Sequence, residues 1–137
     1  MNAELTIQQV ATLTQLSTHT LRYYERIGLV TQVSRAPSGH RRYSKQDIAW
    51  INFLTKLRAT GMPIVKMQQF AELRRQGDST IPERRFLLEV HQQEVQEQLN
   101  RLNQNLALIQ DKIELYKKME SHYDDTQTSE ESGKEPL

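Results

Sequence analysis

The chain has 137 residues, of which 36% are hydrophobic and 26% are charged, and it contains no cysteine. Its length suits one compact domain with an extended element, and the lack of cysteine excludes disulfide bonds, thiolate metal ligation and cysteine catalysis within the protomer. No segment approaches the roughly 18 apolar residues that cross a bilayer, and the N-terminus lacks the pattern of a signal peptide, so we expect a cytoplasmic protein.

The charges are unevenly distributed, although the net charge is only +1. Residues 1–66 carry nine Lys or Arg against three acids, a net charge of +6. Residues 67–122 have a net charge of −1, and residues 123–137 have a net charge of −4. A basic N-terminal part can neutralise phosphates and release their counterions, which is the sequence-independent component of DNA affinity.

Two capped helices are predicted near the N-terminus. Thr6 is a candidate N-cap for a helix over about 7–13, and Ser17 is one for a second helix that ends at Gly28. Gly28 suits a helix end because glycine tolerates positive φ. Two helices joined by a tight turn form a helix-turn-helix unit.

The second helix has two different faces. Helical spacing places Leu21, Tyr24 and Ile27 on one side. We expect this side to pack on three apolar residues that precede it: Val10, Leu13 and Leu16.

The opposite face carries hydrogen-bonding side chains: His19, Arg22, Tyr23 and Arg26. A stripe of donors on the outward face of the second helix is what docking into the major groove requires. A solvated basic face is the alternative interpretation, since helix-turn-helix units also occur in proteins that do not bind DNA.

A wing is predicted after the second helix. Residues 29–34 have the β-branched content of a short strand, residues 37–39 signal a turn, and residues 40–43 can return as a second strand. Its tip and return strand carry basic side chains that would clamp the adjacent DNA backbone: Arg35, His40, Arg41 and Arg42.

Two more helices follow the wing. Ser44 and Asp47 have the spacing of a capping box at the start of an apolar helix that ends at Gly61. Pro63 opens a shorter helix that ends at Gly77. The first of these helices is apolar through Ile48, Trp50, Ile51, Phe53, Leu54 and Leu57. In the second, Ile64, Met67 and Phe70 are expected to face inward.

The last long segment predicts a dimerisation helix. Thr80 and Glu83 have capping-box spacing, and no Gly or Pro lies between Pro82 and Gly133. A helix over about 81–122 would be roughly 60 Å long. Its apolar stripe consists of Leu88, Val95, Leu99, Leu102, Leu106, Ile109, Ile113 and Tyr116, in steps of three and four from Val95 onward. One helix cannot bury this stripe, so a coiled coil with a second copy is expected; the alternative is that the helix folds back on its own head.

Several short runs in the first 75 residues occur in a characteristic order and spacing. They are LTI at 5–7, TLRYYERIGL at 20–29, Arg35, GHRRY at 39–43 and DI at 47–48. Together they resemble the winged-helix head of MerR-family transcription regulators.

This resemblance implies a fold and a set of DNA contacts. The fold would be mainly α, with a winged helix-turn-helix head, a helix pair and a long C-terminal helix that forms an antiparallel coiled coil. The DNA-binding residues would be Thr18, His19, Arg22, Tyr23, Tyr24, Arg26, Arg35, His40, Arg41 and Arg42. Spacing places Tyr24 inward, so only its hydroxyl would be left to reach DNA.

The resemblance also implies a mechanism. Dimers of this family bind a pseudo-palindromic promoter site and, on receiving a signal, bend and untwist an overlong spacer so that RNA polymerase can read both promoter elements. The expected partners are therefore double-stranded promoter DNA, a second copy of the chain and RNA polymerase, and the expected location is the nucleoid.

The controlling signal is the part that the sequence determines least. The runs FLTKLRATGMPI and RQGDSTIPERR resemble a subgroup that responds to aldehydes and nitrosative stress through a cysteine in the helix after the wing. Lys56 stands at that position here, so no thiol of this chain can detect an effector. A solvated or phosphate-binding Lys56 is favoured over one that condenses with a carbonyl.

No cofactor, metal site or catalytic centre is predicted. The four histidines, His19, His40, His91 and His122, have no second ligand at metal spacing. Neither a phosphate-binding loop nor a pair of catalytic carboxylates occurs, so we do not expect an enzyme. The other classes considered are an architectural or excisionase-like DNA-bending protein and a coiled-coil adaptor with a vestigial head.

The predicted organisation has three parts. Residues 1–76 form the winged helix-turn-helix DNA-binding domain, residues 77–122 the long dimerisation helix, and residues 123–137 a disordered acidic tail.

Overall fold

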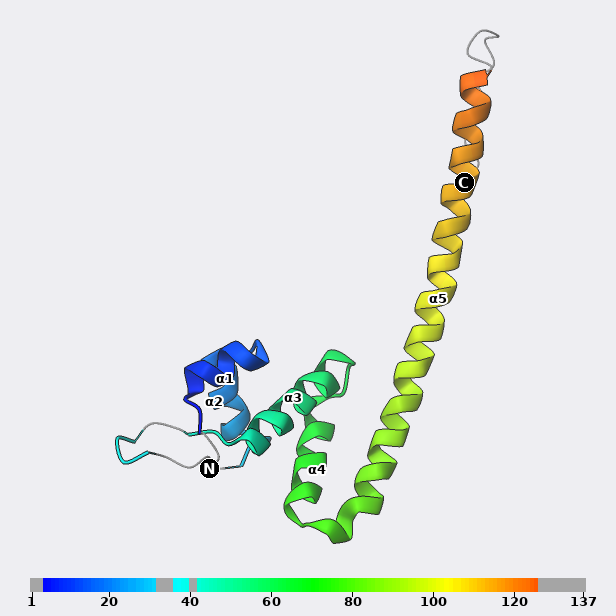
Figure 1. Cartoon of the computed structure of the whole chain (residues 1–137). Helices are drawn as coiled ribbons and strands as arrows, with labels where there is room; N and C mark the ends of the chain where they lie inside the picture. The colour runs from blue at the N-terminus through cyan, green and yellow to red at the C-terminus, as the bar shows by residue number, and fades with distance from the viewer. Residues whose placement is uncertain (1–3, 32–35, 40–41, 126–137) are drawn as a thin grey trace. The chain divides into compact units, whose positions relative to one another are not determined.

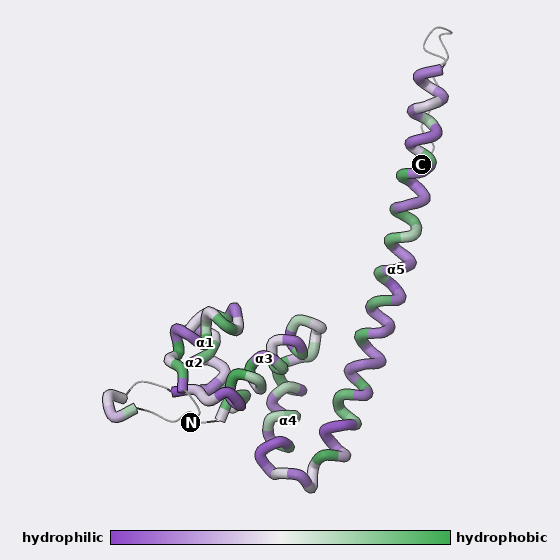
Figure 2. The backbone as a smooth tube through the Cα atoms, viewed as in Figure 1, coloured by the Kyte–Doolittle hydropathy of each residue, from purple (hydrophilic) through white to green (hydrophobic). Residues whose placement is uncertain are grey.

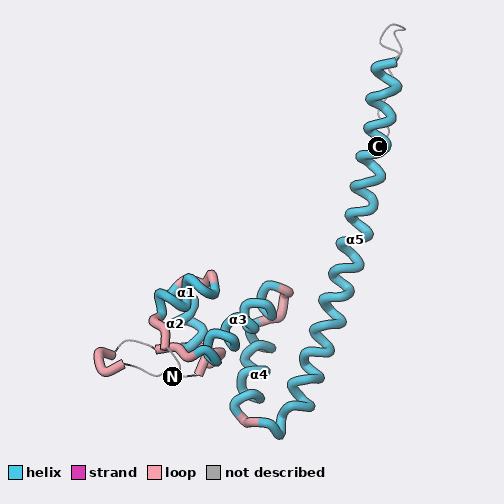
Figure 3. Tube along the Cα trace, viewed as in Figure 1, coloured by secondary structure: helices cyan, strands magenta, loops and turns pink. Residues whose placement is uncertain are grey.

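A computed structural model describes residues 4–31, 36–39 and 42–125. The helices are α1 (Ile7–Thr14), α2 (Thr18–Arg26), α3 (Lys45–Ala59), α4 (Ile64–Arg75), a short 3₁₀ helix η1 (Asp78–Thr80) and α5 (Ile81–Asp125) (Figure 1). The described residues contain no strand (Figure 3). The expectation of a mainly α fold with a long C-terminal helix is confirmed.

Helices α1 and α2 begin where the sequence predicts. The Thr6 hydroxyl accepts a hydrogen bond from the Gln9 backbone N–H at 3.3 Å, and the Gln9 side chain accepts one from the Thr6 N–H at 2.8 Å. Ser17 caps α2 by accepting from the Thr20 N–H at 3.0 Å. Gly28 follows the end of α2 with a φ of 84°. Both helix starts are thus fixed by local hydrogen bonds.

One packing prediction in α1 is wrong. Leu13 is 59% exposed, whereas Val10 is fully buried and Thr14 is only 7% exposed. The buried face of α1 therefore follows the i, i+3, i+7 spacing of Ile7, Val10 and Thr14, and Leu13 lies to one side of it. Thr14 can be buried because its hydroxyl donates to the Val10 carbonyl oxygen at 2.7 Å.

The predicted wing lies only partly within the described residues, because 32–35 and 40–41 are outside them. Leu29 and Val30 are buried and form a bend rather than a strand. Tyr43 forms an isolated antiparallel bridge with Leu5, with N–H to carbonyl distances of 2.8 Å in both directions. The described ends of the wing are therefore held by the helical head.

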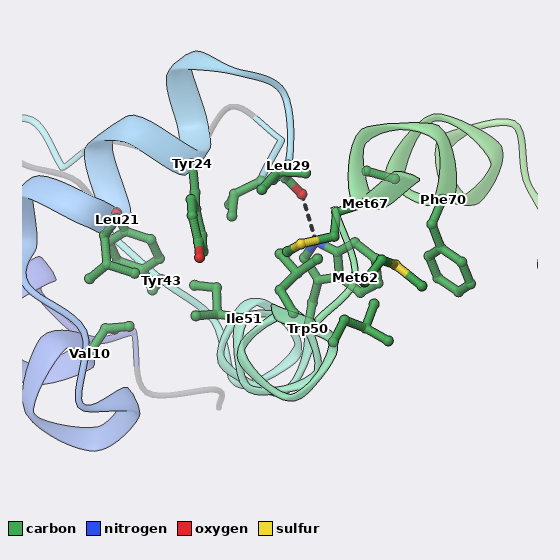
Figure 4. Close-up of a cluster of buried hydrophobic side chains, with 14 of the residues drawn as sticks. Val10, Leu21, Tyr24, Leu29, Tyr43, Trp50, Ile51, Met62, Met67 and Phe70 are labelled. Atoms are coloured by element: carbon green, nitrogen blue, oxygen red, sulfur yellow. Dashed lines mark hydrogen bonds between the residues drawn. The ribbon is translucent and has the colours of Figure 1, made fainter. Parts of the chain in front are cut away.

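The core lies between α1, α2, α3 and α4. Helix α1 packs on α2 and α3, and α3 packs on α4. Figure 4 shows Leu21 and Tyr24 of α2, Trp50 and Ile51 of α3, and Met67 of α4 pointing into one cluster. The predicted capping box at the start of α3 is confirmed, since the Asp47 N–H donates to the Ser44 hydroxyl oxygen and the Ser44 N–H donates to the Asp47 carboxylate.

The start of α5 differs from the predicted capping box. Thr80 ends η1 and is buried, and its hydroxyl lies 2.5 Å from the Leu73 carbonyl oxygen and 2.8 Å from that of Gly77. The same hydroxyl accepts from the Arg84 guanidinium at 3.1 Å. Thr80 therefore joins the start of α5 to the end of α4, and it serves tertiary packing in place of a local cap.

Helix α5 extends through two compact units of the chain. The first unit ends at Val95 and contains the four shorter helices with the first turns of α5; the second begins at Gln96 and contains the rest of α5. The helix ends at Asp125, three residues beyond the predicted end at 122, and the remainder of the predicted tail lies outside the described residues. Within the described residues, no helix is both long and apolar enough to span a membrane.

Candidate nucleic-acid interface

The outward face of α2 is polar and exposed. His19, Arg22, Tyr23 and Arg26 are all exposed, whereas Leu21 on the opposite face is only 1% exposed. Because the buried face is fixed by the core, the orientation of the polar stripe is fixed with it. The structure therefore presents these four side chains together.

Neighbouring side chains order this stripe. The Arg22 guanidinium lies 3.5 Å from the hydroxyl oxygen of Thr18, which is half-buried. The Arg26 guanidinium lies over the Tyr23 ring, 5.6 Å from its centroid. Stacking on an aromatic ring leaves the edge donors of an arginine free for a second partner such as a phosphate.

Tyr24 is an inward residue, as helical spacing predicts. It is 6% exposed and projects from α2 into the cluster of Figure 4. Burial raises the pKa of Tyr24, an effect that the nearby Arg58 charge opposes and Tyr23 reinforces. The neutral phenol is thus the form that the fold favours.

The C-terminal end of α2 is held by side chains from α3 and α4. The Trp50 indole N–H donates to the Leu29 carbonyl oxygen at 2.8 Å (dashed in Figure 4). The Gln68 amide donates to the Ile27 carbonyl oxygen at 2.9 Å. These bonds, with one from Arg75, form a clamp at the junction between α2 and the wing.

Arg75 completes the clamp from α4. Its guanidinium donates to the Gly28 carbonyl oxygen at 2.7 Å and also pairs with Glu72. The hydrogen bond from Arg75 lowers the pKa of Glu72, which favours its charged form. In the sequence, Glu72 and Arg75 are three residues apart, a spacing that predicts only a surface ion pair. Sequence reasoning could not identify the bond from Arg75 to Gly28, which lies 47 positions away.

The basic residues of the wing are mostly outside the described part. Arg35, His40 and Arg41 are not among the described residues. Arg42 is described and half-buried, next to the Tyr43 bridge that anchors the wing to the head. Of the four wing residues, only Arg42 therefore has a described position.

The predicted dimerisation stripe on α5 is exposed to solvent along most of its length. Leu88 and Val95 are half-buried, and Leu88 packs against the core of the head. The remaining stripe residues are exposed: Leu99, Leu102, Leu106, Ile109, Ile113 and Tyr116. Figure 2 shows hydrophobic positions recurring along α5 among hydrophilic ones. Exposed apolar residues at this spacing are typical of a helix face that packs against another helix.

The remaining candidate groups occupy ordinary positions. The Lys56 side chain is exposed on α3. His91 is buried and its Nε2 lies 2.7 Å from the Thr60 hydroxyl oxygen, so it is a packed histidine. No group of three or more potential metal ligands is found among the described residues.

Comparison with known families identifies the chain. The sequence model described as "MerR family regulatory protein" matches residues 6–43, and the one described as "MerR, DNA binding" matches residues 48–120. The chain belongs to the MerR family of DNA-binding transcription regulators. The matches include α1, α2 and α4 and most of α3 and α5.

Individual MerR relatives agree with this assignment. An HTH-type transcriptional regulator of Haemophilus influenzae is 37% identical over 103 residues, which is 75% of this chain and 76% of that protein. The regulator AdhR of Bacillus subtilis is 40% identical over 84 residues, 61% of this chain and 60% of AdhR.

Solved structures of MerR regulators have the same fold. HiNmlR, described as a MerR family regulator lacking the sensor domain and bound to promoter DNA, is 34% identical with a TM-score of 0.78, over 87% of this chain and 94% of HiNmlR. A MerR family regulator from Listeria monocytogenes is 27% identical with a TM-score of 0.84, over 93% of this chain and 99% of that one.

Proposed function

We propose that the chain regulates transcription by binding promoter DNA through the outward face of α2. The observation that carries this proposal is the exposed stripe of His19, Arg22, Tyr23 and Arg26, opposite a face that is buried in the core. A helix presented in this way can place its donors against base edges and phosphates of the major groove. The relative HiNmlR, whose structure contains promoter DNA, supports the same role.

The wing and Tyr24 would complete the interface. Arg35, His40, Arg41 and Arg42 would contact the phosphate backbone beside the groove. Tyr24 could reach DNA only through its hydroxyl, because its ring is buried. Residues 1–76 would thus act as the DNA-binding domain, and the clamp from Trp50, Gln68 and Arg75 would hold α2 at a fixed angle.

The active form would be a homodimer. The exposed stripe on α5 would pair with that of a second copy in an antiparallel coiled coil, so residues 77–122 would be the dimerisation region. Two-fold symmetry then places two α2 helices on a pseudo-palindromic site.

Control would act through DNA distortion. A dimer with fixed spacing between its α2 helices can bend and untwist the promoter and thereby present both promoter elements to RNA polymerase. An activity of this kind requires no catalysis, and it would place the protein on the nucleoid in the cytoplasm. An architectural role without a signal is less favoured by the family.

An electrophoretic shift assay on the promoter fragment of the neighbouring genes tests the proposal. Arg22→Ala should weaken binding by about tenfold or more, because a groove contact is worth ~1–3 kcal/mol. Arg42→Ala should weaken it uniformly across sequences and reduce the salt slope by about 1, as expected for a phosphate contact.

Arg85→Ala is the matched control. Arg85 is an exposed arginine on α5 that pairs with Glu89 at 3.5 Å, so its loss removes the same charge from a different surface. If Arg22→Ala and Arg85→Ala bind the promoter equally well, α2 is not the DNA reader.

A further inference from the structure

A cavity of about 170 Å³ lies in the first unit, where the turn between α3 and α4 meets the first turns of α5. Its walls are apolar: Met62 and Pro63 come from the turn, and Phe86, Leu87 and Val90 come from α5. An apolar cavity of ~150 Å³ is large enough to hold a benzene ring. The cavity therefore has room for one small ring or a short branched chain.

Polar side chains gather at one side of this cavity. Lys66, His91 and Glu94 complete its lining. His91 Nε2 lies 2.7 Å from the Thr60 hydroxyl oxygen, whereas its Nδ1 lies 4.0 Å from the Glu94 carboxylate, beyond hydrogen-bond distance. Lys66 is exposed and has no ion-pair partner among the described residues. The cation without a partner is thus the group best placed to bind a ligand.

We propose that this cavity binds a small carboxylic acid with a single ring or a short branched apolar body. The apolar part would fill the space between Met62, Phe86 and Val90, and the carboxylate would bind Lys66. An apolar cavity with a few polar groups at its edge is the usual form of such a site. Glu94 also lines this edge, so the carboxylate would have to lie on the Lys66 side, away from Glu94. The proposal extends the proposed function, because it supplies an effector class to a regulator that has no thiol.

The position of the cavity would couple this ligand to DNA binding. One wall is the turn after α3, which is held by a hydrogen bond from the Met62 N–H to the Leu57 carbonyl oxygen at 2.9 Å and one from Arg58 to the Met62 carbonyl oxygen at 3.3 Å. The other wall is α5, where Phe86 is 63% exposed and Val90 is 42% exposed. A ligand between the walls would shift the first turns of α5 against the head, and thereby the spacing of the two α2 helices in a dimer.

Calorimetric titration of the full chain with benzoate, phenylacetate and cyclohexanecarboxylate tests the assignment. At least one acid should bind with a Kd of roughly 10 µM to 1 mM, which is typical of ligands with so few atoms. Benzamide, which has the same shape without the charge, should bind about tenfold more weakly. Lys66→Gln should cause a similar loss with the acids and no loss with benzamide.

Two matched variants control for indirect effects. Lys56→Gln removes an exposed lysine of α3 that does not line the cavity, and it should leave the affinity for the acids unchanged. Val90→Trp fills the cavity and should abolish binding, whereas Val65→Trp alters another exposed valine outside the lining and should not.

Two results would overturn the proposal. The first is that none of the three acids binds below about 10 mM. The second is that Val90→Trp dissociates a dimer while the acids have no effect, which would assign the cavity to a second copy of the chain. Promoter shift assays on the unsubstituted protein without ligand separate these failures from failure of the proposed function, because they measure DNA binding by α2 when no acid is present.

Discussion

The head and the distal part of α5 have similar amphipathic patterns, but they use them differently. In the head, the apolar residues of the core are no more than 8% exposed, and four helices bury them without help from another chain. On α5, the stripe residues from Leu99 to Ile113 are 48–63% exposed. An apolar periodicity therefore indicates that one face of a helix will pack against something. Whether that face packs within the same chain depends on how many other helices of the chain lie close enough to cover it.

The same contrast separates the tasks of the two regions. A closed core gives α2 a fixed orientation, which reading a groove requires. An open stripe leaves room for association with a partner, and in the proposed homodimer this association would set the spacing of two such helices. Substitutions in the head should therefore be detected as a loss of stability or of DNA binding, and substitutions in the stripe as a loss of association.

The largest effect is expected from a charge in the α5 stripe. Leu102→Glu places a carboxylate in the proposed coil twice, once in each copy, and should weaken dimerisation by on the order of 10³-fold or more. Sedimentation equilibrium should detect monomers at micromolar concentration, and promoter affinity should fall with them.

Leu108→Glu is the matched control for this experiment. Leu108 is 68% exposed and lies outside the stripe, so its replacement should leave the dimer intact. Equal dissociation by both variants would contradict the assignment of the stripe as the interface.

The next effect concerns the head core. Leu54 is fully buried, and Leu54→Ala should lower the free energy of unfolding by ~2–5 kcal/mol. Leu13→Ala should change it by less than ~0.5 kcal/mol, because Leu13 is exposed. Urea unfolding followed by circular dichroism measures both, and a large loss from Leu13→Ala would restore the packing predicted from the sequence.

A smaller effect is expected at the start of α3. Ser44→Ala removes the hydroxyl of the capping box and should cost ~1 kcal/mol of unfolding free energy. Thr12→Ala removes an exposed hydroxyl that bonds within α1, and it should cost nothing measurable. Similar losses in the two variants would show that the cap contributes no more than a surface hydroxyl.

The smallest effect is a dependence of stability on alkaline pH. The pKa of Tyr24 is raised by burial, so the folded state keeps its proton at pH values where the unfolded state has lost it. This contribution is complete below the ordinary tyrosine pKa near 10 and is lost as the pH rises through the folded-state pKa. The stability advantage of the unsubstituted chain over Tyr24→Phe should therefore decline above about pH 10; a constant difference from pH 8 to 11 would count against burial of the phenol.

Local features of this fold could be predicted from the sequence, because their causes are local. Thr6, Ser17 and Ser44 lie three residues from the N–H groups that they accept from, and Gly28 supplies the positive φ at the end of α2. The polar and apolar faces of α2 also follow from spacing alone. The same spacing identified the stripe on α5, although it could not establish what covers it.

Features that depend on tertiary contacts could not be predicted in this way. Thr14 and Thr80 are buried because their hydroxyls find backbone carbonyl groups, an option that hydrophobic patterns ignore. Trp50, Gln68 and Arg75 donate to carbonyl groups 21, 41 and 47 residues away, and no periodicity relates such positions. The clamp on α2 could therefore be identified only from the three-dimensional structure.

Trp50 gives this protein an intrinsic optical probe. It is the only tryptophan in the chain, its ring is stacked on Phe70 with centroids 5.8 Å apart, and the Arg74 guanidinium lies 4.2 Å from its centroid. Because its N–H bonds to the carbonyl group at the junction of α2 and the wing, its emission will change whenever that junction moves. If DNA or the proposed ligand moves the junction, fluorescence of the unlabelled, unmodified protein would report it.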